Sequence, residues 1–145
     1  LLNFRTKISR KEFTEAVRTL AQRFEQQTRV ATSVRWQGTG PPLNAEQQLQ
    51  FIFILQESLS NIRKHAHAGQ VNIEFDNQHD FTMTISDNGC GFDTAALAKL
   101  SGSHVGLGIM RERALRIRAE LSITSQPDTG SQVRLCLPHQ ERNLA

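Results

Sequence analysis

A carboxylate, Asp87, stands directly before a turn that contains Gly89 and Gly91. Every second residue from Phe81 onward is apolar until Asp87, so on a strand these side chains share one face with the carboxylate. The apolar residues predict a core, which places the carboxylate at the edge of that core. The glycines permit positive φ and a close approach of the backbone to a ligand. This arrangement favours a site in which the carboxylate accepts a hydrogen bond from a ligand. A strand that ends in an ordinary Asx turn has the same pattern.

A second set of polar residues lies on one stripe of a predicted helix: Glu57, Asn61 and Lys64. Their spacing of three and four residues brings a carboxylate, a carboxamide and an ammonium group to the same side. Over a pocket, these groups would supply a base, a cation ligand and a phosphate contact. The alternative is a solvated helix face with side-chain pairs of the same spacing.

Two further glycines, Gly106 and Gly108, precede a predicted helix over residues 109–118. Backbone N–H groups at the N-terminus of a helix form a natural anion site. A single G-x-G pair is weak support when it stands alone.

The elements that would position these groups follow from the spacing of the apolar residues. Spacings of three and four predict helices over residues 11–27 and 45–66, the second one capped by Asn44. Alternating and β-branched residues predict strands at 30–36, 70–76, 81–87, 120–125 and 132–137. The last four strands form two antiparallel hairpins because short polar turns join them. The order predicts an α+β fold, a two-layer α/β sandwich in which about three helices cover a mixed, mostly antiparallel sheet.

The composition bounds the class of protein. The chain has 145 residues, 38% of them hydrophobic and 21% charged, which fits one domain and argues against membrane spans, coiled coils and disorder. A net charge of +3 suits an anionic ligand but is too diffuse to indicate nucleic acid. Two cysteines make no disulfide framework, so we expect a reducing compartment. The chain begins without methionine, and we expect it to be a piece of a longer protein.

The motifs occur in a fixed order that resembles the ATP-binding (Bergerat) fold shared by gyrase, the Hsp90 chaperone, sensor histidine kinases and the MutL mismatch-repair protein. Within that superfamily, the greatest similarity is to sensor histidine kinases of the nitrate/nitrite type, over residues 1–5, 56–66, 87–92 and 106–114. The motifs that carry the resemblance are Glu57-x-x-x-Asn61-x-x-Lys64-His65, Asp87-x-Gly89-x-Gly91, Gly106-x-Gly108 and Gly130-Ser131.

The resemblance implies a role for each of these positions. Asp87 would accept a hydrogen bond from the adenine amino group, Asn61 would bind the Mg²⁺ that bridges the phosphates, and Glu57 would polarise or deprotonate the attacking nucleophile. Positive charge at Lys64 and His65 would neutralise the phosphates. The remaining nucleotide-binding positions would be Gly89, Gly91, Gly106, Leu107, Gly108 and Ser131, with residues 92–105 as a lid over ATP.

The implied activity is that of a two-component sensor kinase. The chain would transfer the γ-phosphoryl group of ATP to a histidine on a homodimeric dimerisation domain before Leu1, for relay to a response regulator of the nitrate-regulator type. We expect a helix end or linker at residues 1–10, the ATP-binding catalytic domain at 11–138 and a flexible tail at 139–145. The resemblance implies a cytoplasmic domain that contacts neither nucleic acid nor membrane, within a full-length protein of the bacterial inner membrane.

Two other functions of the same fold stay open. One is a serine kinase of the anti-sigma-factor type, and the other is a nucleotide-binding module without catalysis. The sequence also departs from the family pattern at residues 116–120, where relatives carry a glycine pair that ends the helix. Without those glycines, the helix must end by another route.

Overall fold

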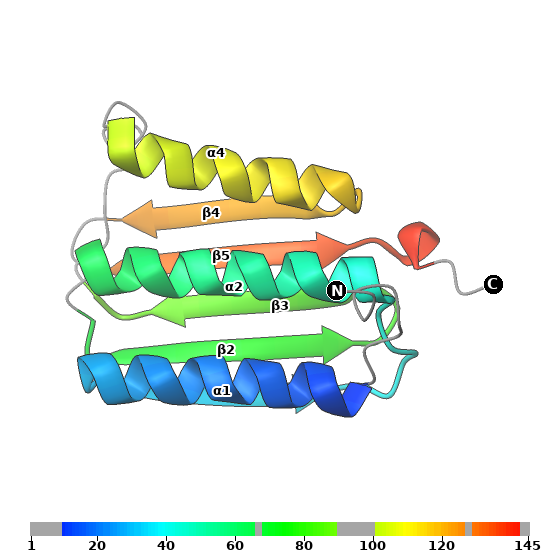
Figure 1. Cartoon of the computed structure of the whole chain (residues 1–145), viewed down its shortest axis with the longest axis horizontal. Helices are drawn as coiled ribbons and strands as arrows, with labels where there is room; N and C mark the ends of the chain where they lie inside the picture. Colours follow the sequence, from blue (N-terminus) through cyan, green and yellow to red (C-terminus); the bar gives the residue numbers. More distant parts are fainter. Residues whose placement is uncertain (1–9, 66–67, 90–100, 127–128, 143–145) are drawn as a thin grey trace, which may run out of the picture.

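The computed structural model describes residues 10–65, 68–89, 101–126 and 129–142. Within these ranges the chain forms two layers, one of helices and one of strands (Figure 1). The elements are α1 (Arg10–Thr28), β1 (Ala31–Gln37), α2 (Ala45–His65), β2 (Gln70–Asn77), β3 (Phe81–Asp87), α4 (Ser101–Arg116), β4 (Glu120–Gln126), β5 (Gly130–Leu137) and the short 3-10 helix η2 (His139–Glu141).

The strands form a five-stranded sheet in the order β1-β2-β3-β5-β4. β1 runs parallel to β2, and the other neighbours are antiparallel. Helices α1, α2 and α4 all lie against one face of this sheet (Figure 1). The predicted two-layer α+β fold, with its mixed and mostly antiparallel sheet, is therefore confirmed. β3 is the central strand, which puts its last residue, Asp87, in register with Val71 of β2 and Ser131 of β5.

The core lies between the sheet and the helices. The alternation predicted for β3 is confirmed, because every second side chain from Phe81 to Asp87 is buried against the helices. The same alternation buries one face of β2 and one of β5. The largest fully buried apolar side chains are Phe51, Ile54, Leu55, Ile73, Phe75, Met83, Ile85, Met110, Leu135 and Leu137.

Asn44 caps the start of α2, as predicted. The Gln47 N–H donates to Asn44 Oδ1 at 2.8 Å, and the Asn44 N–H donates to Gln47 Oε1 at 3.0 Å. This reciprocal pair satisfies two N–H groups at the start of the helix. On the face of α2 that packs against the core, Phe51, Ile54 and Leu55 are fully buried, whereas Ile52 is only half-buried.

Two helices end on arginines rather than glycines. Arg118, just after α4, has φ +57°, and its N–H donates to the Leu115 carbonyl at 3.1 Å. The next N–H, that of Ala119, donates to the Ala114 carbonyl at 2.9 Å, which completes a Schellman motif. Arg29 ends α1 similarly, with φ +61° and a hydrogen bond to Glu25. The missing glycine pair is therefore replaced by an arginine in the left-handed conformation.

The start of α4 differs from the prediction. We expected Gly106 and Gly108 to precede the helix, but α4 begins at Ser101 and both glycines lie inside it. A glycine in a helix costs about 1 kcal/mol relative to alanine. The helix continues through the glycines despite this cost, because its later turns bury Met110 and Ala114 against the core.

The C-terminal segment also differs from the predicted flexible tail. His139–Glu141 form η2, and the side chain of Arg142 is 5% exposed. Its guanidinium donates to the carbonyls of Gln78 at 3.0 Å and Pro41 at 2.6 Å, and to Asn77 Oδ1 at 2.6 Å. Burial lowers the pKa of Arg142, an effect that the nearby Asp80 partly opposes. Residues 143–145 lie outside the described part of the chain.

None of the helices that the structure describes combines the length and the apolar character needed to span a membrane.

Candidate functional site

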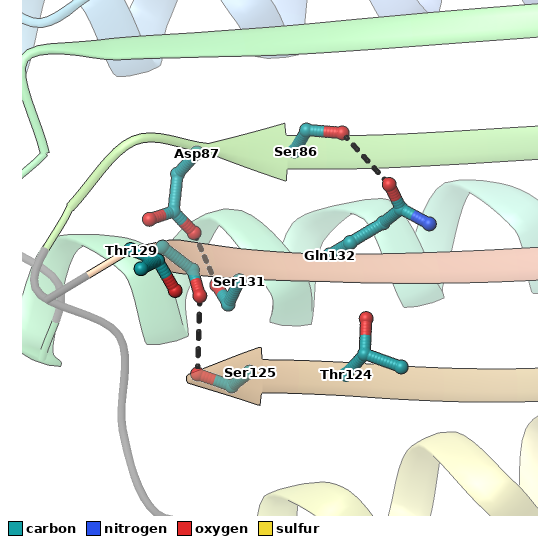
Figure 2. Close-up of a pocket in the computed structure, with 8 residues that line it drawn as sticks. Ser86, Asp87, Thr124, Ser125, Thr129, Ser131 and Gln132 are labelled. Atoms are coloured by element: carbon teal, nitrogen blue, oxygen red, sulfur yellow. Dashed lines mark hydrogen bonds between the residues drawn. The ribbon is translucent and has the colours of Figure 1, made fainter. Parts of the chain in front are cut away.

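The Asp87 carboxylate is fixed by its own neighbourhood. The side chain is 8% exposed. Its Oδ1 accepts the Gly89 N–H at 2.8 Å, and its Oδ2 accepts the hydroxyl of Ser131 from the adjacent strand (Figure 2). An ionised carboxylate can accept about four hydrogen bonds. Both oxygens therefore have a defined direction and still have capacity for a ligand donor.

Two residues that the sequence analysis did not assign to the site hold the backbone around Asp87. Gly130 has φ +110°, and a Cβ at this position would lie 2.1 Å from the Asp87 carbonyl oxygen, so only glycine fits. Asn88 Oδ1 accepts the N–H groups of Gly69 and Gln70, each at 2.9 Å, and thereby ties the turn after β3 to the start of β2. The turn composition around Gly130 indicates a glycine with a special backbone conformation. Nothing local in the sequence indicates the role of Asn88.

A polar cavity of about 320 Å³ opens at this end of the sheet. Asp87 and Ser131 border it together with hydroxyl and amide side chains from the ends of β3, β4 and β5 (Figure 2). Ser125 Oγ donates to the Gly130 carbonyl at 3.4 Å, and Ser86 Oγ donates to Gln132 Oε1 at 3.5 Å. The described residues of this rim offer hydrogen-bonding groups and, apart from the Asp87 carboxylate, carry no charge.

A second, narrow cavity continues the site between the helices and the sheet. Ser131 lines it together with Asn61 of α2 and Leu107 of α4, so one serine contacts both Asp87 and the space in front of Asn61. This cavity holds about 10 Å³, the room of a single water molecule. A ligand larger than water therefore requires α2, α4 and the sheet to separate at this point.

The structure brings some of the predicted site residues together and leaves others apart. Asn61 and Glu57 are half-buried on α2, whereas Lys64 is exposed. Of these three, only Asn61 is among the described residues that line the cavity beside Ser131. Gly89 is buried beside Asp87. Gly108 is exposed, and nothing lies within 4 Å of the position that a Cβ would take there.

Several predicted positions fall outside what the structure describes. Gly91 and most of the predicted lid belong to the undescribed segment 90–100. His65 is the last residue of α2, and Gly106 lies within α4; only their backbone is described.

The arrangement suits a polar ligand that carries both a hydrogen-bond donor and phosphate groups. The donor would meet Asp87, and the amide oxygen of Asn61 is a hard ligand of the kind that Mg²⁺ takes. In the described part of the chain, no cluster of three His, Cys, Asp or Glu side chains is placed to hold a metal ion. Asn61 alone fits a Mg²⁺ that arrives with the phosphates, because such an ion keeps several waters and few protein ligands.

Comparison with known proteins defines the class. Residues 46–141 match the family described as "Histidine kinase-, DNA gyrase B-, and HSP90-like ATPase". This range is more than half of the chain, and it contains Asn61, Asp87 and Ser131. The chain therefore belongs to this ATPase family, and its nucleotide is ATP.

Two curated relatives that the chain resembles are named as sensor proteins or histidine kinases. The chain is 33% identical over 116 residues to "Signal transduction histidine-protein kinase/phosphatase DegS" of Brevibacillus brevis, which covers 79% of this chain and 29% of that protein. It is 42% identical over 86 residues to "Sensor protein VraS" of Staphylococcus haemolyticus, over 59% of this chain and 24% of that protein. The chain thus spans 24–29% of the length of these relatives.

Solved structures confirm the fold. The histidine kinase AdeS of Acinetobacter baumannii matches with a TM-score of 0.69 at 17% identity, over 92% of this chain and 66% of that one. The histidine kinase domain of the Erythrobacter litoralis EL346 blue-light activated histidine kinase matches with a TM-score of 0.67 at 19% identity, over 90% and 62%.

Proposed function

We propose that this chain is the catalytic domain of a two-component sensor histidine kinase, which transfers the γ-phosphoryl group of ATP to a histidine on a dimerisation domain outside this chain. The observation that carries the proposal is the fixed Asp87 carboxylate, which Ser131 connects to the cavity in front of Asn61. The names of the curated relatives support the choice of a sensor kinase over a serine kinase or a non-catalytic module of the same fold.

In this proposal Asp87 selects the nucleotide. Its oxygens accept a hydrogen bond from the adenine amino group, which guanine cannot give because it carries a carbonyl at that position. The Ser131 hydroxyl holds one carboxylate oxygen and leaves the other lone pairs directed at the ligand. Gly89 and Gly91 allow the backbone to pass close to the base.

The phosphate end of the site would lie at α2 and α4. Asn61 would hold Mg²⁺, which neutralises phosphate charge when it is bound with ATP. Glu57, one helical turn before Asn61, would accept the proton of the attacking histidine. Positive charge from Lys64 and His65 would face the phosphates. N–H groups of Gly106, Leu107 and Gly108 would bind phosphate only after the first turns of α4 unwind, because in an α-helix these groups are engaged within the helix.

The proposal extends to the whole protein as follows. The kinase would act as a homodimer, pass its phosphoryl group to a response regulator of the nitrate-regulator type and be held at the bacterial inner membrane as a nitrate/nitrite-type sensor. The motifs at residues 56–66 and 106–114 support this subfamily.

The experiment is a comparison of binding and transfer. We expect the chain to bind Mg-ATP and ADP in calorimetry, and a longer protein that includes the dimerisation helices to label itself from γ-labelled ATP. Glu57→Gln should keep ATP binding and abolish labelling, because the carboxamide cannot accept the proton. Unchanged labelling would remove Glu57 from the mechanism.

The position of the acceptor is tested separately. This chain alone should show little autophosphorylation, because the acceptor histidine lies outside it in this proposal. Robust labelling of the isolated chain would contradict that part of the proposal, and labelling of a partner's serine would favour the anti-sigma-factor type.

A further inference from the structure

A groove lies between α1 and α2, two helices that run side by side on the sheet (Figure 1). It has a volume of about 360 Å³ and continues into a second hollow of about 310 Å³, which shares Phe24, Gln27 and Arg63 with it. We call the two hollows together the Arg63 groove. From Leu20 to Thr28 the groove follows α1 for about 12 Å, or roughly two helical turns.

The floor of the Arg63 groove is apolar and its rims are polar. Phe24 and Leu59 are 5–6% exposed and form the floor. The rims carry two exposed arginines, Arg23 of α1 and Arg63 of α2, together with amide and hydroxyl side chains. None of the described residues that line either hollow is acidic. An occupant would therefore place apolar groups on the floor and meet two positive charges at the rims.

The two rim arginines lack the acidic neighbours that pair with arginines elsewhere. Arg18, which lies outside the groove, forms an ion pair with Glu15 one turn earlier on α1. No acidic residue stands three or four positions from Arg23 or Arg63 in the sequence, which is the spacing at which helical side chains pair. Neither arginine takes part in an ion pair between described residues. Their charge is not neutralised within the described part of the chain.

The shape of the groove favours a helical occupant. A pocket for a small molecule encloses most of its ligand, whereas this groove runs between two exposed rims. Extended peptides add to the edges of sheets, and amphipathic helices bind in grooves of this kind. The lining residues of α1 and of α2 recur at three- and four-residue spacing, so a third helix can lay its own ridge of side chains between them.

We propose that the Arg63 groove is a docking surface for an acidic amphipathic helix of a partner protein. Apolar side chains of that helix would lie on Phe24 and Leu59, and its carboxylates would pair with Arg23 and Arg63. Charge complementarity selects this occupant, because a basic or neutral helix would leave two guanidinium groups beside it without a counter-charge.

The groove lies next to the candidate nucleotide site without containing its predicted residues. Arg63 and Asn61 are two positions apart on α2, so their side chains point about 200° apart around the helix. Ile62 lies between them and lines both the groove and the narrow cavity beside Asn61. A docked helix would thus contact the turns of α2 that carry Asn61. The inference stands apart from the proposed kinase activity, because docking requires neither a nucleotide nor an acceptor histidine.

Two synthetic peptides test the charge and shape of the occupant. Both are amphipathic helices with leucines at three- and four-residue spacing; glutamates flank the leucines in one, and lysines replace the glutamates in the other. We expect the chain to bind the glutamate peptide in calorimetry, with an affinity that falls as salt is added, and to bind the lysine peptide far more weakly. Equal binding of the two peptides, or no binding of the glutamate peptide, would overturn the proposal.

Substitutions at the rims locate the binding. An exposed ion pair contributes up to about 5-fold in affinity, so Arg23→Ala and Arg63→Ala should each weaken binding of the glutamate peptide by roughly 2- to 5-fold, and together by about 4- to 25-fold. Arg18→Ala and Arg35→Ala are the matched controls, because each removes the same charge from an exposed position outside the groove. An equal loss in the controls would show attraction by net charge in place of a site and would refute the assignment.

Two further readings do not depend on lost peptide binding. The double variant Arg23→Glu and Arg63→Glu should prefer the lysine peptide, and a retained preference for the glutamate peptide would contradict the proposal. Vesicles of phosphatidylglycerol test the other anionic surface that a cell offers, and we expect them not to retain the chain through these arginines. Retention of the parent chain that is lost when Arg23 and Arg63 are both changed to alanine would assign the groove to a membrane surface and overturn the proposal.

Discussion

At the scale of single residues, the site depends on a carboxylate whose two oxygens are already directed by the protein. Asp87 receives one hydrogen bond from its own turn and one from Ser131 on the neighbouring strand. A ligand donor therefore meets a group that needs no reorientation. Removing the charge should weaken the ligand contact more than it weakens the fold.

Asp87→Asn tests this point. The amide can still accept the Gly89 N–H, and the Ser131 hydroxyl can rotate to accept from the new N–H₂ group, so the fold should persist. A hydrogen bond to a charged group contributes about 1.5–3 kcal/mol, which predicts a roughly 10- to 100-fold loss of ATP affinity in calorimetry. Glu74→Gln is the control, because Glu74 is an exposed acid on β2 whose ion pair with Arg35 contributes little. Unchanged affinity in Asp87→Asn would remove the adenine role.

Gly130→Ala tests the backbone beside the carboxylate. The new Cβ would collide with the Asp87 carbonyl oxygen, and φ +110° is unfavourable for alanine. Backbone strain alone costs about 1–3 kcal/mol, so we expect lower stability in urea unfolding together with weaker ATP binding. Gly108→Ala is the matched control for the stability measurement alone, because it has open space and a helical position; it should raise stability by about 0.5–1 kcal/mol. Equal effects of the two substitutions would contradict the steric argument.

At the scale of elements, periodicity predicted most of the fold. The strands and the first two helices follow from the alternation and spacing of apolar residues, and Asn44 is visible as a cap because Gln47 stands three residues later. The contact between Asp87 and Ser131 could not be predicted locally, because it depends on the β3–β5 register. The start of α4 was missed for another reason. Glycine disfavours a helix only weakly, and tertiary packing decides where such a helix begins.

The end of α4 gives a prediction at this scale. Arg118 adopts the left-handed conformation of the Schellman motif, which costs a non-glycine residue about 1–2 kcal/mol. Its side chain is 80% exposed, and its contact with Glu141 is long, at 4.0 Å, so little is lost with it. Arg118→Gly should therefore raise the midpoint of thermal unfolding. Arg116→Gly, inside the helix, should lower it, and a lower midpoint in Arg118→Gly would contradict the assignment of the cap.

At the scale of the whole molecule, the two ends of the sheet have different roles. The end at Asp87 carries the polar cavity and the candidate site. At the other end, Arg142 joins the loop after β1, the turn after β2 and the C-terminal segment through three hydrogen bonds. Gln47 Nε2 adds a fourth connection by donating to the Glu141 carbonyl at 3.0 Å. Segments far apart in the sequence are thus held together at the end of the sheet remote from the candidate site.

Arg142→Ala tests whether that end stabilises the fold without contributing to the site. The substitution removes the guanidinium donor to the Gln78 carbonyl and to Asn77 Oδ1, and one of the two donors to the Pro41 carbonyl. It also removes the guanidinium packed 5.5 Å from the Phe81 ring centre. We expect a loss of about 2–3 kcal/mol in the free energy of unfolding, measured in urea through Trp36 emission. Arg142→Met should lose less, because it fills the space and removes the cost of burying a charge. Arg134→Ala, an exposed arginine on β5, should stay within about 0.5 kcal/mol of the parent.

ATP affinity below the unfolding transition should be the same in all three variants. A drop confined to Arg142→Ala would show that the two ends of the sheet are coupled and that the division of roles is wrong.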